Sequence, residues 1–251
     1  MRIASLGSGS KGNATLVQYQ QTTLLVDCGF SLKQFVERLK RLEMEPADID
    51  AVFMTHEHSD HSGGVARLCS KHGIPLWTAI GTARAVLEEG FEFNALVAGV
   101  SVTIGGIEVL PVTVPHDASE PLQFVFRQLD NGRRLGVLTD TGHITSHIVN
   151  SYSALNGLLL EFNYDPLMLE NGPYPYSLKQ RVGGDLGHLS NDQSIDMLRQ
   201  IDTTSLDCLI AAHISEKNNS PSLVASRIEQ IADLPIPVIA CQDEGFGWIS
   251  V

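Results

Sequence analysis

The 251-residue sequence contains no apolar run of about 18 residues, the length that a membrane-spanning helix needs. It also lacks a charged N-terminal segment followed by an apolar one, so it predicts neither a membrane span nor a signal peptide. Only four cysteines are present, and Cys28, Cys69, Cys208 and Cys241 are scattered without paired spacing. Cysteines of this kind are expected to be buried, reduced thiols, which favours a cytoplasmic protein.

Basic residues are in the minority, since 17 Lys and Arg stand against 29 Asp and Glu and give a formal net charge of -12. This balance argues against a broad nucleic-acid-binding surface. Bound divalent cations would offset part of the charge at the place where a substrate phosphate would lie. The 43% hydrophobic composition is sufficient for a complete core, so we expect one domain over residues 1–251.

Histidine is concentrated in one short segment, Thr55-His56-Glu57-His58-Ser59-Asp60-His61. The apolar run Ala51-Val52-Phe53-Met54 precedes it and predicts a buried strand. Ser62-Gly63-Gly64-Val65 follows and predicts the start of a helix. The segment is therefore expected to form a loop between a strand and a helix.

The spacing within this loop suits two metal ions. Alternate side chains of an extended segment share a side, so His56 and His58 can bind one ion. Asp60 and His61, one step further round the turn, can bind a second. Imidazole and carboxylate ligands together suit zinc, manganese or iron rather than calcium.

Further ligand candidates follow other strand-like runs. His116, Asp140 and His213 each come directly after an apolar run of this kind. A sheet delivers side chains at its strand ends to a common edge, so we expect these residues to lie near the histidine-rich loop.

The remaining pattern predicts two halves, each with strands followed by mixed helices and strands, and two face-to-face sheets with helices outside accommodate it as an αββα sandwich. Turns are expected at Gly105-Gly106 and Asp130-Asn131-Gly132. The expected helices are Ser31–Glu45, 62–72, Thr82–Glu89, one from Thr145, a long helical region after residue 165, and 221–232. The expected strands are Arg2–Leu6, Ala14–Tyr19, Thr23–Val26, Ala51–Met54, Ile74–Thr78, several between Val100 and Thr139, Leu158–Glu161, 207–212 and Val238–Cys241.

The set of strand-end motifs resembles the metallo-β-lactamase superfamily. The resemblance implies one metal site from His56, His58 and His116, and a second from Asp60, His61 and His213. Asp140 would then bridge the two ions. It also implies that Asp27, which closes the strand Thr23–Val26, holds the ligand loop in place.

The spacing of the motifs resembles compact members of that superfamily. No room remains for the tRNA-clamping arm of the usual bacterial RNase Z, or for the large extra domain of RNase J and the β-CASP nucleases. The compact YycJ/WalJ-type metallohydrolases are the most similar group, and they look like DNA exonucleases of the 5′-to-3′ kind. The matching segments are Leu6–Thr15, Thr55–His61, Glu161–Asp165, Gly172–Pro175, Gly184–Asn191 and His213–Asn219.

Two further residues distinguish the possible reactions. Glu161 and His188 resemble the RNase Z pair in which a glutamate orients a histidine that protonates the leaving oxygen. A phosphodiester leaves as an alkoxide, so a general acid is useful. A thioester hydrolase needs no such acid, because a thiolate leaves readily.

The resulting hypothesis is a two-metal phosphodiesterase that acts on DNA or another nucleic acid. A water between the two ions would become the attacking hydroxide, oriented by Asp60 and Asp140, and His188 would protonate the leaving oxygen. Zinc and manganese suit the ligands alike. The candidates for substrate contacts, each of which could equally be a solvated or helix-capping polar residue, are Ser10, Lys11, Lys179, Arg181, Ser190, Asn191, Lys217, Asn218 and Asn219.

Three alternatives stay open at the level of the sequence. A phosphodiesterase for small or cyclic phosphate esters fits the acidic composition. A thioester or lactone hydrolase has the same metal ligands but leaves Glu161 and His188 unexplained. A metal-stabilised binding module without activity is disfavoured by the intact ligand set.

Overall fold

The computed structural model describes residues 1–251 and arranges the strands in two seven-stranded sheets. The first sheet, in chain order, consists of β1 (Arg2–Gly7), β2 (Ala14–Tyr19), β3 (Thr22–Val26), β4 (Ala51–Phe53), β5 (Leu76–Ala79), β6 (Asn94–Leu96) and β14 (Phe246–Ser250). The second consists of β7 (Val102–Ile104), β8 (Ile107–Thr113), β9 (Leu122–Gln128), β10 (Arg134–Leu138), β11 (Gly157–Glu161), β12 (Cys208–Ala212) and β13 (Val238–Ile239).

Both sheets are mixed. The order β14-β1-β2-β3 is antiparallel, and β3 to β6 run parallel. In the second sheet β7 to β10 are antiparallel, and β10 to β13 are parallel. The parallel strands of each sheet end at one edge, so the loops that follow them meet there.

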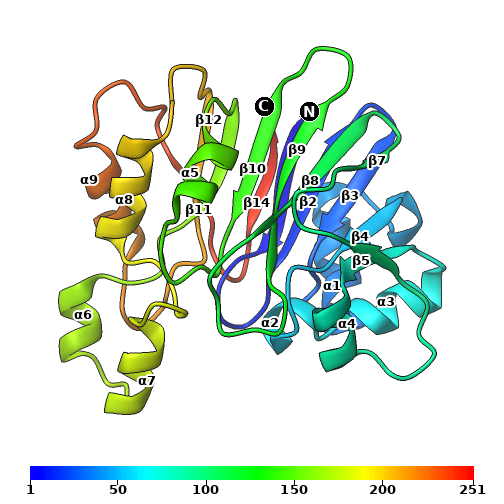
Figure 1. The fold of residues 1–251 in the computed structure, drawn as a ribbon, viewed down its shortest axis with the longest axis horizontal. Coiled ribbons are helices and arrows are strands. Elements are labelled where there is room, and N and C mark those ends of the chain that lie inside the picture. The colour runs from blue at the N-terminus through cyan, green and yellow to red at the C-terminus, as the bar shows by residue number, and fades with distance from the viewer.

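Helices cover the outer faces of the two sheets (Figure 1). They are α1 (Leu32–Leu39), α2 (Ser59–Ser62), α3 (Val65–His72), α4 (Ile80–Val86), α5 (Ser146–Tyr152), α6 (Pro166–Asn171), α7 (Tyr176–Val182), α8 (Asn191–Gln200) and α9 (Pro221–Ile228). α1 and α3 pack on the first sheet, while α5, α8 and α9 pack on the second. The expected αββα sandwich is confirmed.

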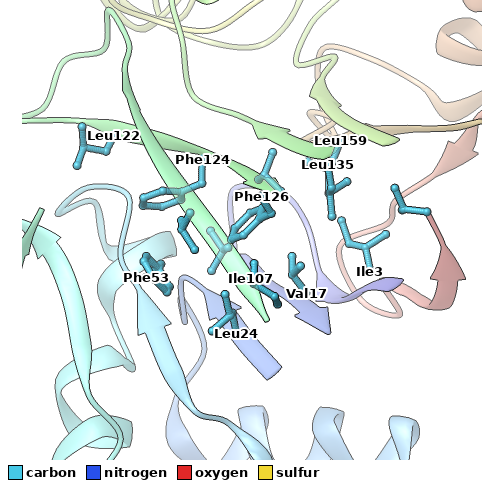
Figure 2. Close-up of a cluster of buried hydrophobic side chains, with 14 of the residues drawn as sticks. Ile3, Val17, Leu24, Phe53, Ile107, Leu122, Phe124, Phe126, Leu135 and Leu159 are labelled. Carbon is cyan, nitrogen blue, oxygen red and sulfur yellow. The ribbon is translucent and has the colours of Figure 1, made fainter. Parts of the chain in front are cut away.

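Each strand buries side chains on both of its faces. In β3, Leu24 and Val26 belong to the cluster between the sheets, whereas Leu25 belongs to the cluster beneath α1 and α3. Successive side chains of a strand point to opposite faces, so a strand covered on both sides reads as a continuous apolar run. Between the sheets, Phe53 and Phe124 pack edge to face with ring centroids 5.5 Å apart (Figure 2).

Several boundaries differ from those expected from the sequence. The helix expected over Ser31–Glu45 ends at Leu39 and continues as a 3-10 turn, because Glu43 adopts a left-handed conformation with φ 57°. The long helical region after residue 165 is divided into α6, α7 and α8, since glycines and prolines interrupt it. Two strands were not expected from the sequence: β6, which pairs parallel with β5, and β14, which pairs antiparallel with β1.

The cysteines follow the expectation with one exception. Cys28, Cys69 and Cys208 are buried, and burial raises the pKa of the Cys28 thiol to about 12. Cys241 is exposed, because β13 ends at Ile239 and leaves it in the following turn. None of the helices is both long and apolar enough to cross a membrane.

Candidate metal centre

The expected metal ligands follow the ends of strands. His56 and His58 lie in the loop after β4, whereas Asp60 and His61 lie on the short helix α2, which begins at Ser59, within the segment expected to be a loop. His116, Asp140 and His213 follow β8, β10 and β12. These segments gather at the lower edge of the sandwich in Figure 1, where α2 lies and which is opposite the two termini. The topology thus brings residues from four separate segments to one place.

The strand ends at this edge are strained. Asp27, Asp140 and His213 adopt left-handed backbone conformations with φ of 59°, 50° and 53°. A non-glycine residue held there costs on the order of 1–3 kcal/mol and persists only where its surroundings fix it. Strain at three neighbouring polar residues marks this edge as a functional site.

The first cluster consists of His56, His58 and His116, whose ring nitrogens lie within 4.8 Å of one another. His58 Nδ1 is 3.1 Å from His56 Nε2 and 3.3 Å from His116 Nε2. Three imidazoles that face a common point provide the nitrogen ligands that zinc and related cations prefer.

The second cluster consists of Asp60, His61 and His213. Asp60 Oδ2 lies 3.6 Å from His61 Nε2 and 3.7 Å from His213 Nε2. His213 Nε2 is buried and makes no hydrogen bond. A buried polar atom without a partner is costly, and a cation at this point would satisfy it.

Asp140 lies between the two clusters. Its Oδ2 is 3.0 Å from His61 Nε2, and its Oδ1 is 3.4 Å from His213 Nδ1. Asp140 also lies close enough to His56 and His61 to share a metal ion with them. Oδ2 is buried and makes no hydrogen bond, like His213 Nε2. The residues therefore fit two divalent ions, with a carboxylate that can contact both.

Neighbouring groups fix the orientation of the ligands. Asp27 accepts hydrogen bonds from the Thr55 backbone N at 2.8 Å, from Thr55 Oγ1 at 2.7 Å and from His61 Nδ1 at 2.7 Å. Thr55 Oγ1 lies 2.9 Å from His56 Nδ1, and His116 Nδ1 donates to Gly187 O at 3.0 Å. Each of these rings consequently presents Nε2 to its cluster, as metal-binding histidines do.

The glycine-rich loop after β1 supports the centre through its backbone and side chains. The backbone N of Asn13 donates to Asp60 O at 2.8 Å, and the backbone N of His213 donates to Ser8 Oγ at 2.9 Å. Ser10 lines the pocket above the clusters. The loop is thus both a turn and part of the rim.

The centre concentrates negative charge that the histidines offset. Burial opposes a charge on His213, but the carboxylates of Asp140, Asp60 and Glu161 together outweigh it and raise the pKa of His213 to about 10. The pKa of His61 is raised well above its ordinary value, since Asp140 and Asp27 outweigh its burial. Burial lowers the pKa of His56. The carboxylates that favour a positive charge on His61 and His213 would equally favour metal cations at this point.

Glu161 and His188 form a hydrogen-bonded pair beside the clusters. Glu161 is fully buried at the end of β11, and its Oε1 accepts from His188 Nδ1 at 2.8 Å and from His213 Nδ1 at 3.0 Å. Its Oε2 accepts from the backbone N of Thr141 and Leu189, both at 3.2 Å. Burial opposes a charge on His188, but the Glu161 carboxylate raises its pKa above the ordinary value.

A pocket of about 350 Å³ opens above the clusters. The expected ligands His58, Asp60, Asp140 and His213 line it, together with His188. Tyr174 and residues of α7 also line it. Of these only Arg181 was a candidate from the sequence.

Two lining residues of this pocket form an ion pair. Arg181 Nε donates to Asp117 Oδ2 at 2.6 Å, and Asp117 Oδ1 is 3.5 Å from His116 Nε2. Asp117 was not singled out from the sequence, although its position directly after His116 was a signal.

The structure brings only some of the expected substrate-contact residues to this pocket. Ser10 and Arg181 line it. Lys11 Nζ is paired with Glu216 at 2.8 Å, Lys179 Nζ donates to Glu170 O at 2.6 Å, and Lys217 is exposed outside the pocket.

Four polar candidates are buried instead. Ser190 caps α8 by accepting from the backbone N of Gln193. Asn191 and Asn219 exchange side-chain hydrogen bonds at 2.8 and 3.0 Å, and Asn218 is also buried. These residues connect α8 to the loop after β12 and do not face the pocket.

Known proteins resemble this chain in sequence and in fold. Residues 22–214 match the profile of the family described as beta-lactamase superfamily domain. The chain is 31% identical to an exodeoxyribonuclease YycJ of Bacillus anthracis (98% of the chain, 91% of the relative) and 32% identical to an exodeoxyribonuclease WalJ of Streptococcus pneumoniae (94% and 90%). The structure of Zn(2+)-bound PqqB from Methylobacterium extorquens superimposes over all of both chains, with a TM-score of 0.75 at 16% identity.

Proposed function

Since the chain belongs to the beta-lactamase superfamily and is a metal-dependent hydrolase, we propose that it is a dinuclear phosphodiesterase that degrades DNA as an exonuclease. The two relatives named exodeoxyribonuclease support DNA as the substrate, because each aligns over nine-tenths or more of this chain. The 5′-to-3′ direction is part of the proposal.

One observation carries the reaction class: His188 Nδ1 lies 2.8 Å from a fully buried carboxylate oxygen of Glu161. A carboxylate accepts hydrogen bonds, so Nδ1 donates to it and the ring presents Nε2 on its opposite side. His188 lines the pocket, where a leaving oxygen would lie. Hydrolysis of a thioester would not require this oriented acid, because a thiolate leaves without protonation.

In the proposed mechanism, His56, His58 and His116 would hold one divalent ion, Asp60, His61 and His213 would hold the other, and Asp140 would serve both. Bound ions of this kind supply Lewis-acid activation of the phosphate and of the attacking water.

The chain's own residues then control the proton. Glu161 fixes the ring of His188 and favours its positively charged form, since the carboxylate raises the pKa of His188. His188 passes a proton to the oxygen of the departing sugar, which would otherwise leave as a high-energy alkoxide.

The test is hydrolysis of labelled single-stranded DNA, duplex DNA, RNA, bis-p-nitrophenyl phosphate and a thioester by protein reconstituted with zinc or with manganese. We expect single nucleotides to be released from DNA and no turnover of the thioester. DNA that carries phosphorothioate linkages at the 5′ end alone should be protected, whereas the same linkages at the 3′ end should not. Protection by the 3′ modification would reverse the proposed direction.

A phosphodiesterase for small phosphate esters is a second candidate, favoured by the net charge of -12. The salt dependence of substrate affinity separates the two. A DNA exonuclease with this surface should show a shallow slope, which corresponds to one or two phosphate contacts rather than to the roughly 6–10 of a broad interface. Saturable turnover of small esters together with inert DNA would favour the second candidate.

A further inference from the structure

One part of the pocket lining, here called the apolar wall, differs in character from the metal clusters and the other polar lining residues. Its apolar lining residues are Tyr174, Leu178 and Val182. Leu178 and Val182 lie four positions apart on α7, so they share one face of that helix. Tyr174 lies two residues before α7 and adjoins them in the pocket lining. All the apolar lining therefore comes from one short segment.

This segment stands apart from the sheets. α6 and α7 lie at the lower edge of the molecule, below α8 (Figure 1). Tyr174 and Leu178 are half-buried, so their side chains keep one side free towards the pocket. Tyr174 makes no side-chain hydrogen bond within the chain, and its ring is available to a ligand.

A charged group stands next to this apolar wall. The side chain of Arg181 is 59% exposed, and its one hydrogen bond runs from Nε to Asp117 at 2.6 Å. Both of its Nη groups are left without a protein partner. Held by Asp117 at the pocket rim, the guanidinium can donate two hydrogen bonds to a phosphate.

The size of the pocket limits what can enter. Its volume of about 350 Å³ is near the lower end of the roughly 300–1,000 Å³ that ligand pockets occupy. One nucleotide fits such a space, with its reacting phosphate at the clusters. A base pair does not, since the second base would need equal room on the Watson–Crick edge of the first.

From these observations we infer that the Tyr174–Val182 segment forms a binding site for the terminal nucleobase, so that the enzyme takes one unpaired nucleotide at a time. The inference rests on the proposed function. The base lies against Tyr174, Leu178 and Val182, and Arg181 binds a phosphate at the rim. The enzyme therefore acts on ends that are single-stranded or can fray, because a paired end must first lose its base pair and its stacking.

The test measures binding and does not require turnover of DNA. Dissociation constants are determined by calorimetry for deoxyadenosine 5′-monophosphate and for 2-deoxyribose 5-phosphate with metal-loaded protein. Stacking of a base on an aromatic ring contributes a factor of about 5–150 in affinity. We expect the nucleotide to bind more tightly than the sugar phosphate by that factor.

Variants assign the effect to the wall. Tyr174→Ala should bring the ratio of the two constants close to one, and Tyr174→Phe should preserve it. Tyr176→Ala is the matched control, because this tyrosine of the same segment is 77% exposed and lies outside the pocket. Equal binding of both ligands by the wild type, or the same loss in both alanine variants, would overturn the inference. A base-dependent ratio in a protein that does not cleave DNA would instead retain the inference and refute the proposed exonuclease.

Discussion

Replacement of His188 by Ala separates a phosphodiesterase from other hydrolases with the same metal ligands. The side chain contacts Glu161 at 2.8 Å through Nδ1 and lies 3.3 Å from Asp140 Oδ1. It belongs to neither of the two three-residue clusters described above, although it also groups with Asp140, Glu161 and His213. Because its Nδ1 donates to Glu161, we expect its loss to leave the metal content intact. The substitution removes the oriented proton donor from the pocket.

The size of the effect depends on the leaving group. General acid catalysis contributes about 10²–10⁴-fold, and its share increases with the basicity of the group that leaves. Cleavage of DNA expels a poor alkoxide, so kcat should fall by about that factor in His188→Ala. Bis-p-nitrophenyl phosphate expels a stable phenolate, and its hydrolysis should hardly change.

The assay compares both substrates in the same metal-loaded preparations, with metal content measured by elemental analysis. His147→Ala is the matched control, because His147 is an exposed histidine on α5 remote from the pocket. Equal slowing of both substrates by His188→Ala, or loss of metal from that variant, would assign His188 a structural or ligand role. The general-acid mechanism would then have to be abandoned.

Further predictions concern the metal centre. Protein purified without chelator should contain close to two transition-metal ions per chain by elemental analysis. Asp140→Ala should reduce activity by orders of magnitude. Full activity with a single ion would contradict a dinuclear centre. Metal binding should release protons and weaken as the pH falls, because the ion must displace the proton that the raised pKa of His213 retains. Calorimetry in buffers of different ionisation enthalpy measures this proton release. Metal binding without proton release would refute the argument. Glu161→Gln should move the alkaline limb of the pH–rate profile for DNA cleavage to lower pH, because the variant lacks the carboxylate that raises the pKa of His188. An unchanged alkaline limb would show that His188 is not the general acid.

The fold, and the convergence of the expected metal ligands at one place, could be predicted because they depend on local patterns. A buried strand that ends in a cluster of histidines needs no tertiary information to be recognised, and the alternation in the loop placed His56 and His58 together. The family resemblance is confirmed by the match over residues 22–214. The same patterns placed His116, Asp140 and His213 at strand ends, which the two sheets bring together at one edge.

The substrate side was harder to predict, since its polar residues are paired across long sequence distances. Asn191 and Asn219 look like surface amides in the sequence, but each satisfies the other in a buried contact. Lys11 looked available for a phosphate and is paired with Glu216 from the other half of the chain. Tyr174 was part of a matching motif, yet nothing local indicated that its ring would line the pocket.

Glu161 connects the two parts of the proposed mechanism. Its Oε1 accepts hydrogen bonds from both His188 and His213, so one buried oxygen orients the proposed acid and one of the expected ligands. Carboxylates that orient metal-binding histidines typically change metal affinity by about 10–100-fold when they are replaced. The glutamate therefore cannot be altered without disturbing the second metal site, whereas His188 can. Because of this asymmetry, the alanine variant of the histidine isolates proton transfer, and the glutamine variant of the glutamate must be analysed at saturating metal.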